Sequence, residues 1–278
     1  MSQAEQTSFF LRVQQALLEC DSAQKVKATH HLAKEVATLK LDHDRELPLV
    51  VDPGRPLRPE LVVPRQLPKR KPNSIVGRAT LYHAVAHIEF NAINLALDAA
   101  GRFRGLPDDY YYDWIGVAAE EAYHFTLIQA HLRLLGYDYG DFPAHNGLWE
   151  MALTSREDPL LRMALVPRYL EARGLDVNPG MAARLKQSGD DNGVSLLEII
   201  LRDEIGHVAV GDRWFRYLCQ QRQLPPEESY RQLIARYTDN KSRPPYHFEA
   251  RRAAGFSEEE LSLLEGYQYP KTHNHSGA

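Results

Sequence analysis

The apolar positions of residues 195–221 recur at three-, four- and seven-residue steps, which predicts a helix with one face in a core. Glu204 and His207 fall inside this apolar stripe, each three or four residues from one of its members. A carboxylate on a buried face is costly unless something compensates its charge. The helix therefore needs a charge partner on this face. The stripe consists of Leu197, Ile200, Leu201, Val208 and Phe215.

The same periodicity predicts three further long helices, so that residues 74–221 form the core of a four-helix bundle. The first runs from Ser74 to about Ala100 and is ended by Gly101. The second runs from about Asp108 to Leu135 and stops at Gly136. A loop rich in glycine and aromatic residues follows it.

Proline and aspartate mark the third helix of the bundle. Asp158 is a good N-cap, with Pro159 at the first helical position. Pro167 is expected to kink this helix and to free a backbone carbonyl. Asn178-Pro179 is expected to open a separate short helix that ends at about Gln187.

Three segments surround the bundle core, and together they complete one all-α domain over residues 1–278. Residues 5–45 predict two N-terminal helices with a break near Asp21-Ser22. Proline recurs through residues 46–73, which predicts an extended arm. Residues 222–278 predict C-terminal helices, the last opened by the capping box Ser257-x-x-Glu260, and then a disordered tail.

Two Glu-x-x-His motifs carry the candidate chemistry. Of the 12 histidines, only His124 and His207 have a glutamate three residues earlier, at Glu121 and Glu204. On a helix this spacing places an oxygen and a nitrogen ligand on adjacent turns of one face. A single such motif is weak, because its ordinary interpretation is a solvated helix face.

The spacing of two further glutamates strengthens the pattern. Glu89 lies 32 residues before Glu121, and Glu171 lies 33 residues before Glu204, so the two halves of the core repeat one plan. Four helices that present Glu, Glu-x-x-His, Glu and Glu-x-x-His inward match the ligand pattern of ferritin-like carboxylate-bridged dimetal proteins. The predicted metal ligands are Glu89, Glu121, His124, Glu171, Glu204 and His207.

Charge balance and ligand type indicate which metals would suit this site. Four buried glutamates bring four negative charges, which two divalent ions neutralise. Oxygen and imidazole ligands without thiolate favour two Fe ions, or Mn, over Cu(I) or structural zinc. Glu120 and Asp203 precede the ligand glutamates and are expected to accept hydrogen bonds from the ligand histidines; Asp203 shares a helix face with His207.

Composition limits the remaining interpretations. With 33 basic and 37 acidic residues and a net charge of −4, the chain lacks a global attraction to nucleic acid or acidic membrane. The N-terminal sequence has no signal-peptide pattern and no apolar run long enough to span a membrane, which indicates a cytoplasmic protein. Cys20 and Cys219 are expected to be reduced core thiols.

Other basic and histidine residues are interpreted as structural. The arm carries a basic cluster that could grip an anionic partner, although a solvated strap across the bundle or a dimer neighbour is favoured. His83, His87 and His145 stay outside the ligand set, the first two because they lie off the face of Glu89. The basic cluster consists of Arg55, Arg58, Arg65, Lys69, Arg70 and Lys71.

Five stretches of the core carry a resemblance to a known family. They read GRATLYHAVAHIEFNAINLALDA, DWIGVAAEEAYHF, YGDFPAHNGLW, VPRYLEARGLDV and RDEIGHVAVGDRWF. From about residue 5 to 256 the chain resembles the bacterial ferritin-like family of domain of unknown function 455, itself similar to the tRNA-modifying di-iron monooxygenase MiaE. The resemblance implies a ferritin-like bundle with a dimetal site at the six residues named above. It implies no substrate.

Two functional hypotheses follow from these patterns. The first is a di-iron oxidoreductase that activates O2 to oxidise or hydroxylate an unidentified organic or nucleotide-containing substrate, with a small molecule favoured and an unknown electron donor. The second is a non-enzymatic iron- or metal-binding protein of the ferritin-like class, or a site that serves only the fold. The sequence assigns no catalytic residue beyond the metal ligands, and it leaves a homodimer open.

Overall fold

The structure is a computed structural model that describes residues 7–68, 71–238 and 243–266, and within these residues it contains helices and no β-strand. The all-α prediction is therefore confirmed. The helices are α2 (Phe9–Leu18), α3 (Ser22–Glu35), α4 (Ile75–Arg102), α5 (Asp108–Leu134), α6 (Gly147–Thr154), α7 (Pro159–Leu165), α8 (Ala172–Gln187), α9 (Asp191–Gln221), α10 (Pro226–Tyr237), α11 (Phe248–Ala253) and α12 (Glu258–Gly266), with the short turns η1 (Val36–Thr38), η2 (Pro64–Gln66) and η3 (Val166–Glu171).

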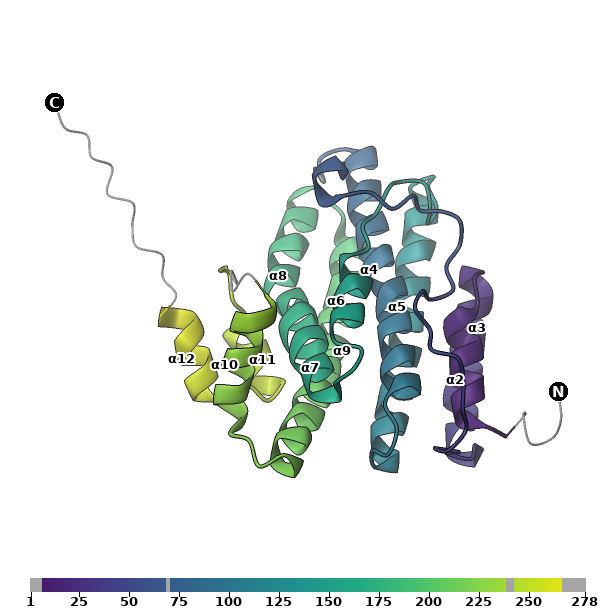
Figure 1. The fold of residues 1–278 in the computed structure, drawn as a ribbon. Helices are drawn as coiled ribbons and strands as arrows, with labels where there is room; N and C mark the ends of the chain where they lie inside the picture. The colour runs from purple at the N-terminus through teal and green to yellow at the C-terminus, as the bar shows by residue number, and fades with distance from the viewer. Residues whose placement is uncertain (1–6, 69–70, 239–242, 267–278) are drawn as a thin grey trace.

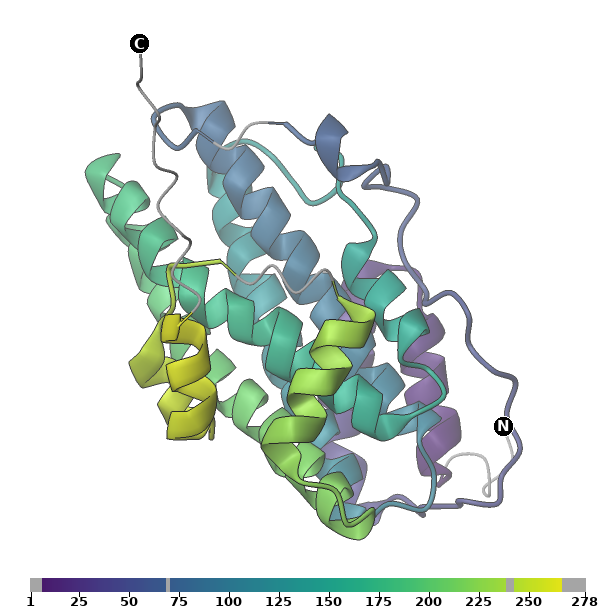
Figure 2. The ribbon, with the colours of Figure 1, turned by 60° about the vertical axis from the view of Figure 1, so that its left-hand side comes forward.

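Four long helical segments lie side by side in the middle of the molecule (Figure 1). Helix α4 packs along α5, and the continuous segment α7–η3–α8 packs along α9. Helices α5 and α9 join the two pairs. Helices α2 and α3 cover the outer side of the first pair, and α10, α11 and α12 lie beyond the second pair (Figures 1 and 2).

Side-chain caps fix where three of the long segments begin, because the first amide groups of a helix lack partners within it. Ser74 Oγ accepts a hydrogen bond from the Gly77 amide at the start of α4. Asp158 caps α7 ahead of Pro159, as the sequence predicts. Asp190 caps α9, which therefore begins four residues before the predicted Ser195.

Two other predicted helix boundaries are wrong. Helix α4 continues through Gly101 to Arg102, and Gly101 instead lets α2 approach, since a Cβ there would lie 3.1 Å from Val13. Helix α8 runs unbroken through Pro179, so there is no separate short helix after Asn178. The Asn178 amide donates to the Leu197 carbonyl of α9 (2.9 Å), which holds α8 in place where the proline removes a helical hydrogen bond.

Pro167 produces the expected irregularity, in the form of a π-helical turn, η3. Proline cannot donate a backbone hydrogen bond, and π turns absorb such a defect by widening the helix. Within the turn, the carbonyl of Arg168 accepts a hydrogen bond from Tyr230 Oη (2.9 Å). Glu171 ends this turn, so the π turn sets the position of a predicted ligand.

Two short helices form where the sequence patterns indicated none. Helix α6 occupies the end of the loop after α5, where buried Trp149 donates to the Val51 carbonyl. Helix α11 follows the Pro244-Pro245 segment, and His247 caps it. The predicted capping box of α12 is confirmed, because the Ser257 amide donates to Glu260 and the Glu260 amide donates to Ser257 Oγ.

The proline-rich arm lies across its own chain. The Gly54 amide donates to the Leu17 carbonyl, and the Val62 amide donates to the Ala144 carbonyl, each at 2.8 Å. The strap interpretation therefore holds for the described part of the arm, while Lys69 and Arg70 of the basic cluster lie outside the described residues. The predicted disordered tail also lies outside them.

The two cysteines differ in burial, so the prediction of two core thiols is correct for only one of them. Cys219 is buried and free, but Cys20 is exposed at the break between α2 and α3, so it is not a core thiol. The helix break at Asp21 places Cys20 at the surface. Among the described residues, none of the helices has the length and apolar character needed to cross a membrane.

Candidate metal centre

The four long segments bring all six predicted ligands towards the centre of the molecule. Helix α4 supplies Glu89, and α5 supplies Glu121 and His124. The π turn supplies Glu171. Helix α9 supplies Glu204 and His207, of which His207 is 1% exposed. The pairing of helices thus converts the repeat seen in the sequence into one cluster.

Four of these residues form a compact group. Glu89, Glu121, His124 and Glu204 each offer one ligand atom, and these atoms all lie within 4.8 Å of one another. His124 Nδ1 lies 3.4 Å from Glu89 Oε2 and 3.5 Å from Glu121 Oε2. Such a group of buried oxygen and nitrogen atoms could hold a metal ion.

His207 lies on the other side of Glu121. Its Nδ1 is 3.0 Å from Glu121 Oε1 and 3.7 Å from Glu204 Oε2. The two carboxylate oxygens of Glu121 therefore face different histidines, whose ring centres are 5.8 Å apart. Glu121 therefore lies between the two histidines. Glu171 lines one cavity together with Glu89 and Glu204.

Buried atoms without hydrogen-bond partners mark the same six residues. Buried polar atoms are normally paired, and each exception needs an explanation. Within the described residues, both carboxylate oxygens of Glu121 lack a hydrogen bond, as do the inward-facing Nδ1 atoms of the two histidines. One buried carboxylate oxygen also lacks a hydrogen bond in each of Glu89, Glu171 and Glu204. The donor set fits a metal centre, because cations would satisfy all of these atoms together.

Burial shifts the ionisation of three of the glutamates. Burial, with added repulsion from Glu121 and Glu204, raises the pKa of Glu89 well above its usual range. Burial and the charges of Glu204 and Glu121 do the same to the pKa of Glu171. Burial and Glu121 also raise the pKa of Glu204. Without cations, these side chains hold protons that metal ions would replace.

In Glu121 and the two histidines, neighbouring charges outweigh burial and favour the ionised form. Burial alone would raise the pKa of Glu121, but His207 and His124 hold it below its usual range. Burial disfavours the imidazolium of His124, yet the nearby carboxylates of Glu121 and Glu89 raise its pKa to about 11. The pKa of His207 is raised well above its usual value against burial, chiefly by Glu121.

The outer nitrogens of both histidines contact Glu120 and Asp203 as expected, but Asp203 contacts the histidine of the facing helix and not His207 of its own. His207 Nε2 lies 2.7 Å from Glu120 Oε2 of α5. His124 Nε2 lies 3.1 Å from Asp203 Oδ2 of α9. Asp203 was predicted to serve His207 of its own helix; instead each carboxylate reaches across to the facing helix, because the two helices pack directly against each other.

The histidines left out of the ligand set have structural contacts. Buried His87 lies 2.9 Å from Tyr139 Oη and 3.0 Å from the His145 carbonyl. His83 Nε2 accepts a hydrogen bond from the Gly140 amide. These contacts fasten the loop after α5 to α4, away from the carboxylate cluster.

A small cavity adjoins the cluster, and we call it the inner cavity. Its volume is about 200 Å3, and Glu89, Glu171 and Glu204 line one part of it. Ile88, which is 45% exposed, also lines it, so the cavity reaches the surface. Aliphatic side chains form most of the remaining wall, among them Val85, Leu95, Leu170, Val177, Leu197 and Ile200. Sequence patterns gave no sign of this cavity.

Fold and site together define a class: an all-helical protein with a buried glutamate and histidine cluster that could hold a metal ion. The chain belongs to the family described as "Protein of unknown function (DUF455)", whose model matches residues 18–262. It is 41% identical over 273 residues to an uncharacterized protein of Haemophilus influenzae, covering 93% of this chain and 94% of that relative. No solved structure matches the chain.

Proposed function

We propose that the cluster binds two metal ions, Fe or Mn, and that the protein is a ferritin-like oxidoreductase that uses O2 to oxidise a small substrate. One observation carries the proposal: each of the six predicted ligands has a buried polar atom without a hydrogen bond. Four glutamates and two neutral histidines carry four negative charges, which two divalent ions balance. Hard oxygen and imidazole donors suit Fe and Mn.

The protein's own residues would orient and protect such a centre. Asp203 and Glu120 accept hydrogen bonds from the outer nitrogens of His124 and His207, which leaves each Nδ1 directed at the carboxylates. Glu121, with no exposed surface, lies between the two histidines and would bridge two ions. Bound iron would supply the electrons and open coordination positions that O2 reduction requires.

The inner cavity favours an enzyme over a protein that only binds metal. A site used for metal alone needs a path for ions, which polar or charged side chains would provide. Here aliphatic side chains line most of the cavity beside Glu89, Glu171 and Glu204. Apolar walls with a few polar groups are typical of pockets that hold organic molecules.

Anaerobic loading with Fe(II) and subsequent exposure to air tests the proposal. Elemental analysis should find close to two iron ions per chain, and the near-ultraviolet and visible absorbance should change when O2 is admitted. Glu121→Gln should lose most of the metal. Glu198→Gln, which changes an exposed glutamate of α9, should behave as wild type.

Two results would contradict the proposal in different ways. If wild type and Glu121→Gln bind the same small amount of iron, the cluster is not a metal centre. If wild type binds two ions but shows no change with O2, a metal-handling or structural site is the better account.

A further inference from the structure

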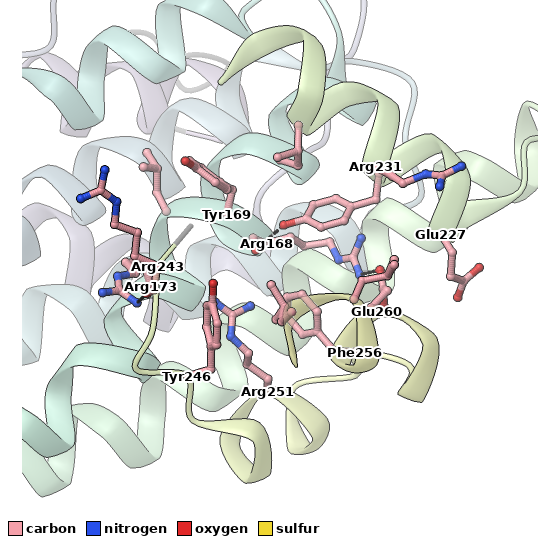
Figure 3. A pocket seen from close by; sticks show the side chains of 15 residues that line it. Arg168, Tyr169, Arg173, Glu227, Arg231, Arg243, Tyr246, Arg251, Phe256 and Glu260 are labelled. Atoms are coloured by element: carbon pink, nitrogen blue, oxygen red, sulfur yellow. Dashed lines mark hydrogen bonds and ion pairs between the residues drawn. The ribbon is translucent and has the colours of Figure 1, made fainter. Parts of the chain in front are cut away.

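A second cavity, the outer cavity, lies directly behind the inner one. Its volume is about 450 Å3, and residues of η3, α8 and α10–α12 line it. Leu170 and Arg173 line both cavities. The residues around the outer cavity include Tyr169, Tyr246 and several arginines (Figure 3). The inner cavity therefore lies between the carboxylate cluster on one side and the outer cavity on the other.

The inner cavity suits a short apolar group. Its volume of about 200 Å3 is below the roughly 300–1,000 Å3 of pockets that enclose whole drug-sized ligands. Its wall is mostly aliphatic apart from the three glutamates, Asn178 and Arg173. A ligand that places an apolar limb here must hold its remaining atoms outside, and the outer cavity provides that space.

Arg173 is the one cationic side chain among the residues that line the inner cavity. Its Nη1 donates to the carbonyls of Arg243 (2.6 Å) and Pro245 (2.9 Å) and lies 3.4 Å from Asp176. Among the described residues, neither Nε nor Nη2 of Arg173 has a hydrogen-bond partner. The guanidinium is thus held at one nitrogen, and its other donors stay available to a ligand.

The charge of Arg173 is only weakly compensated. Asp176, the nearest carboxylate, forms a two-point ion pair with buried Arg251, at 2.9 and 2.7 Å. The same carboxylate also accepts from the His247 amide. Asp176 is therefore largely committed to Arg251, while the Arg173 side chain is 36% exposed. A partly exposed guanidinium with a free edge is suited to a carboxylate or phosphate.

We propose that Arg173 anchors the anionic group of an organic anion whose apolar limb occupies the inner cavity beside the cluster. The anionic group is a carboxylate or a phosphate monoester, which a guanidinium recognises in the same way. The remainder of the ligand lies in the outer cavity against Tyr169 and Tyr246. This deepens the proposed function by naming a substrate class, and it depends on that function only for the reaction, not for binding.

Calorimetric titration of the purified full-length protein tests the proposal with four probes: octanoate, octyl phosphate, and the neutral octanamide and 1-octanol. Wild type should bind at least one of the two anions at least 10-fold more tightly than the neutral probes. Comparing octanoate with octyl phosphate shows which anionic group is preferred. Arg173→Gln should weaken the binding of that anion by roughly 10- to 100-fold, the range for a charged hydrogen bond, and leave 1-octanol unaffected.

Three further variants fix the location. Arg184→Gln, an exposed arginine on the same helix, is the matched control and should bind as wild type. Arg173→Lys should recover part of the anion affinity, because it keeps the charge but loses the planar guanidinium. Val177→Phe, which fills the inner cavity, should weaken the binding of the two anions and of 1-octanol to a similar extent. Thermal melting checks that each variant is folded.

Several results would overturn the proposal. It is wrong if millimolar octanoate and octyl phosphate both fail to bind wild type, or if Arg173→Gln and Arg184→Gln bind them equally. Metal content is measured on the same samples. If the protein loads iron normally but binds neither anion, only the anion-binding proposal is wrong. If it binds an anion but no iron, only the proposed metal centre is wrong.

Discussion

His124 of α5 and Asp203 of α9 lie 3.1 Å apart, through Nε2 of the ring and Oδ2 of the carboxylate. A carboxylate can only accept, so Nε2 carries the proton and Nδ1 is left to face Glu89 and Glu121. The carboxylate is itself held, because Arg202 Nε donates to Asp203 Oδ1. A residue of one helix thus sets which ring nitrogen of a histidine on the facing helix points at the glutamates.

This relationship predicts that Asp203→Asn weakens metal binding without removing a ligand. Mutation of such a partner typically costs about 10- to 100-fold in metal affinity, because a neutral amide accepts more weakly than a carboxylate and can also present its NH2 group to Nε2. Competition with a chromogenic chelator measures the affinity, and Glu198→Gln on the same helix is the control. Unchanged affinity in Asp203→Asn would show that the carboxylate does not orient His124.

The position of Glu121 predicts different metal contents for different variants. His124→Gln and His207→Gln should each retain about one ion per chain, because each removes a ligand from one side of the cluster. Glu121→Gln should retain close to none, since its two oxygens face both histidines. Elemental analysis after equal loading distinguishes these outcomes. Equal losses in all three variants would contradict a bridging role for Glu121.

The grouping of these glutamates and histidines could be predicted from the sequence, because their positions follow the helical repeat. Helical spacing places Glu121 with His124 and Glu204 with His207, whatever surrounds them. The two halves of the core repeat at a distance of about one helical hairpin. This repeat places Glu89 and Glu171 at the same height along the bundle as the two Glu-x-x-His motifs. Regular helices suffice for Glu89, Glu121, His124 and Glu204, which the structure groups within 4.8 Å of one another. Glu171 depends in addition on the π turn that carries it.

The exchanged partners of the histidines could not be predicted in the same way. Asp203 and His207 share a helix face, so spacing alone favours a contact within α9. The observed contacts run between α5 and α9 and depend on how those two helices are rotated against each other. Pro179 gave a wrong boundary for a related reason, since Asn178 anchors α8 to α9 through a tertiary hydrogen bond. Arg173 was not singled out because its surroundings come from Arg243, Pro245 and Asp176.

The π turn predicts a strict requirement for glycine at position 211. A Cβ atom added to Gly211 would overlap the Pro167 ring, so α9 and the π turn pack with no space between them. Gly211→Ala should destabilise the protein by about 1–3 kcal/mol, the range for overpacking a core. Urea denaturation measures the change in the free energy of unfolding.

Gly116→Ala is the matched control for this substitution. A Cβ at position 116 of α5 meets nothing within 4 Å, so alanine should stabilise the helix by roughly 0.5–1 kcal/mol. If both variants change stability in the same direction, then the contact between Pro167 and Gly211 does not position the turn that carries Glu171.

The buried side chain of Lys25 should make the stability of the protein depend on pH, independently of the proposed metal centre. Its side chain is fully buried, and Nζ donates to the carbonyls of Ala16 and Leu17 and to the side chain of Asn94. Burial lowers its pKa from 10.5 to about 7, against the opposing charges of Cys20 and Glu19. The folded protein thus releases this proton at a lower pH than the unfolded chain does.

The sign of the effect follows from proton counting. Below about pH 7 Lys25 is protonated in both states, and the cost of burying its charge is fully present. Between about pH 7 and 10.5 the unfolded chain binds more protons than the folded one, so the contribution of Lys25 to the free energy of unfolding rises with pH. The rise is at most about 1.4 kcal/mol per pH unit.

Urea denaturation at several pH values, with wild type and Lys25→Met compared, isolates this contribution. The packing and the hydrogen bonds that Lys25 makes in either protonation state shift the variant's stability at every pH, whereas the titration makes wild type gain on the variant as pH rises above about 7. Lys27→Met, on the exposed side of the same helix, should follow the wild-type profile. Parallel profiles for wild type and Lys25→Met would mean that the three oxygens around Nζ keep Lys25 charged throughout, against the effect of burial.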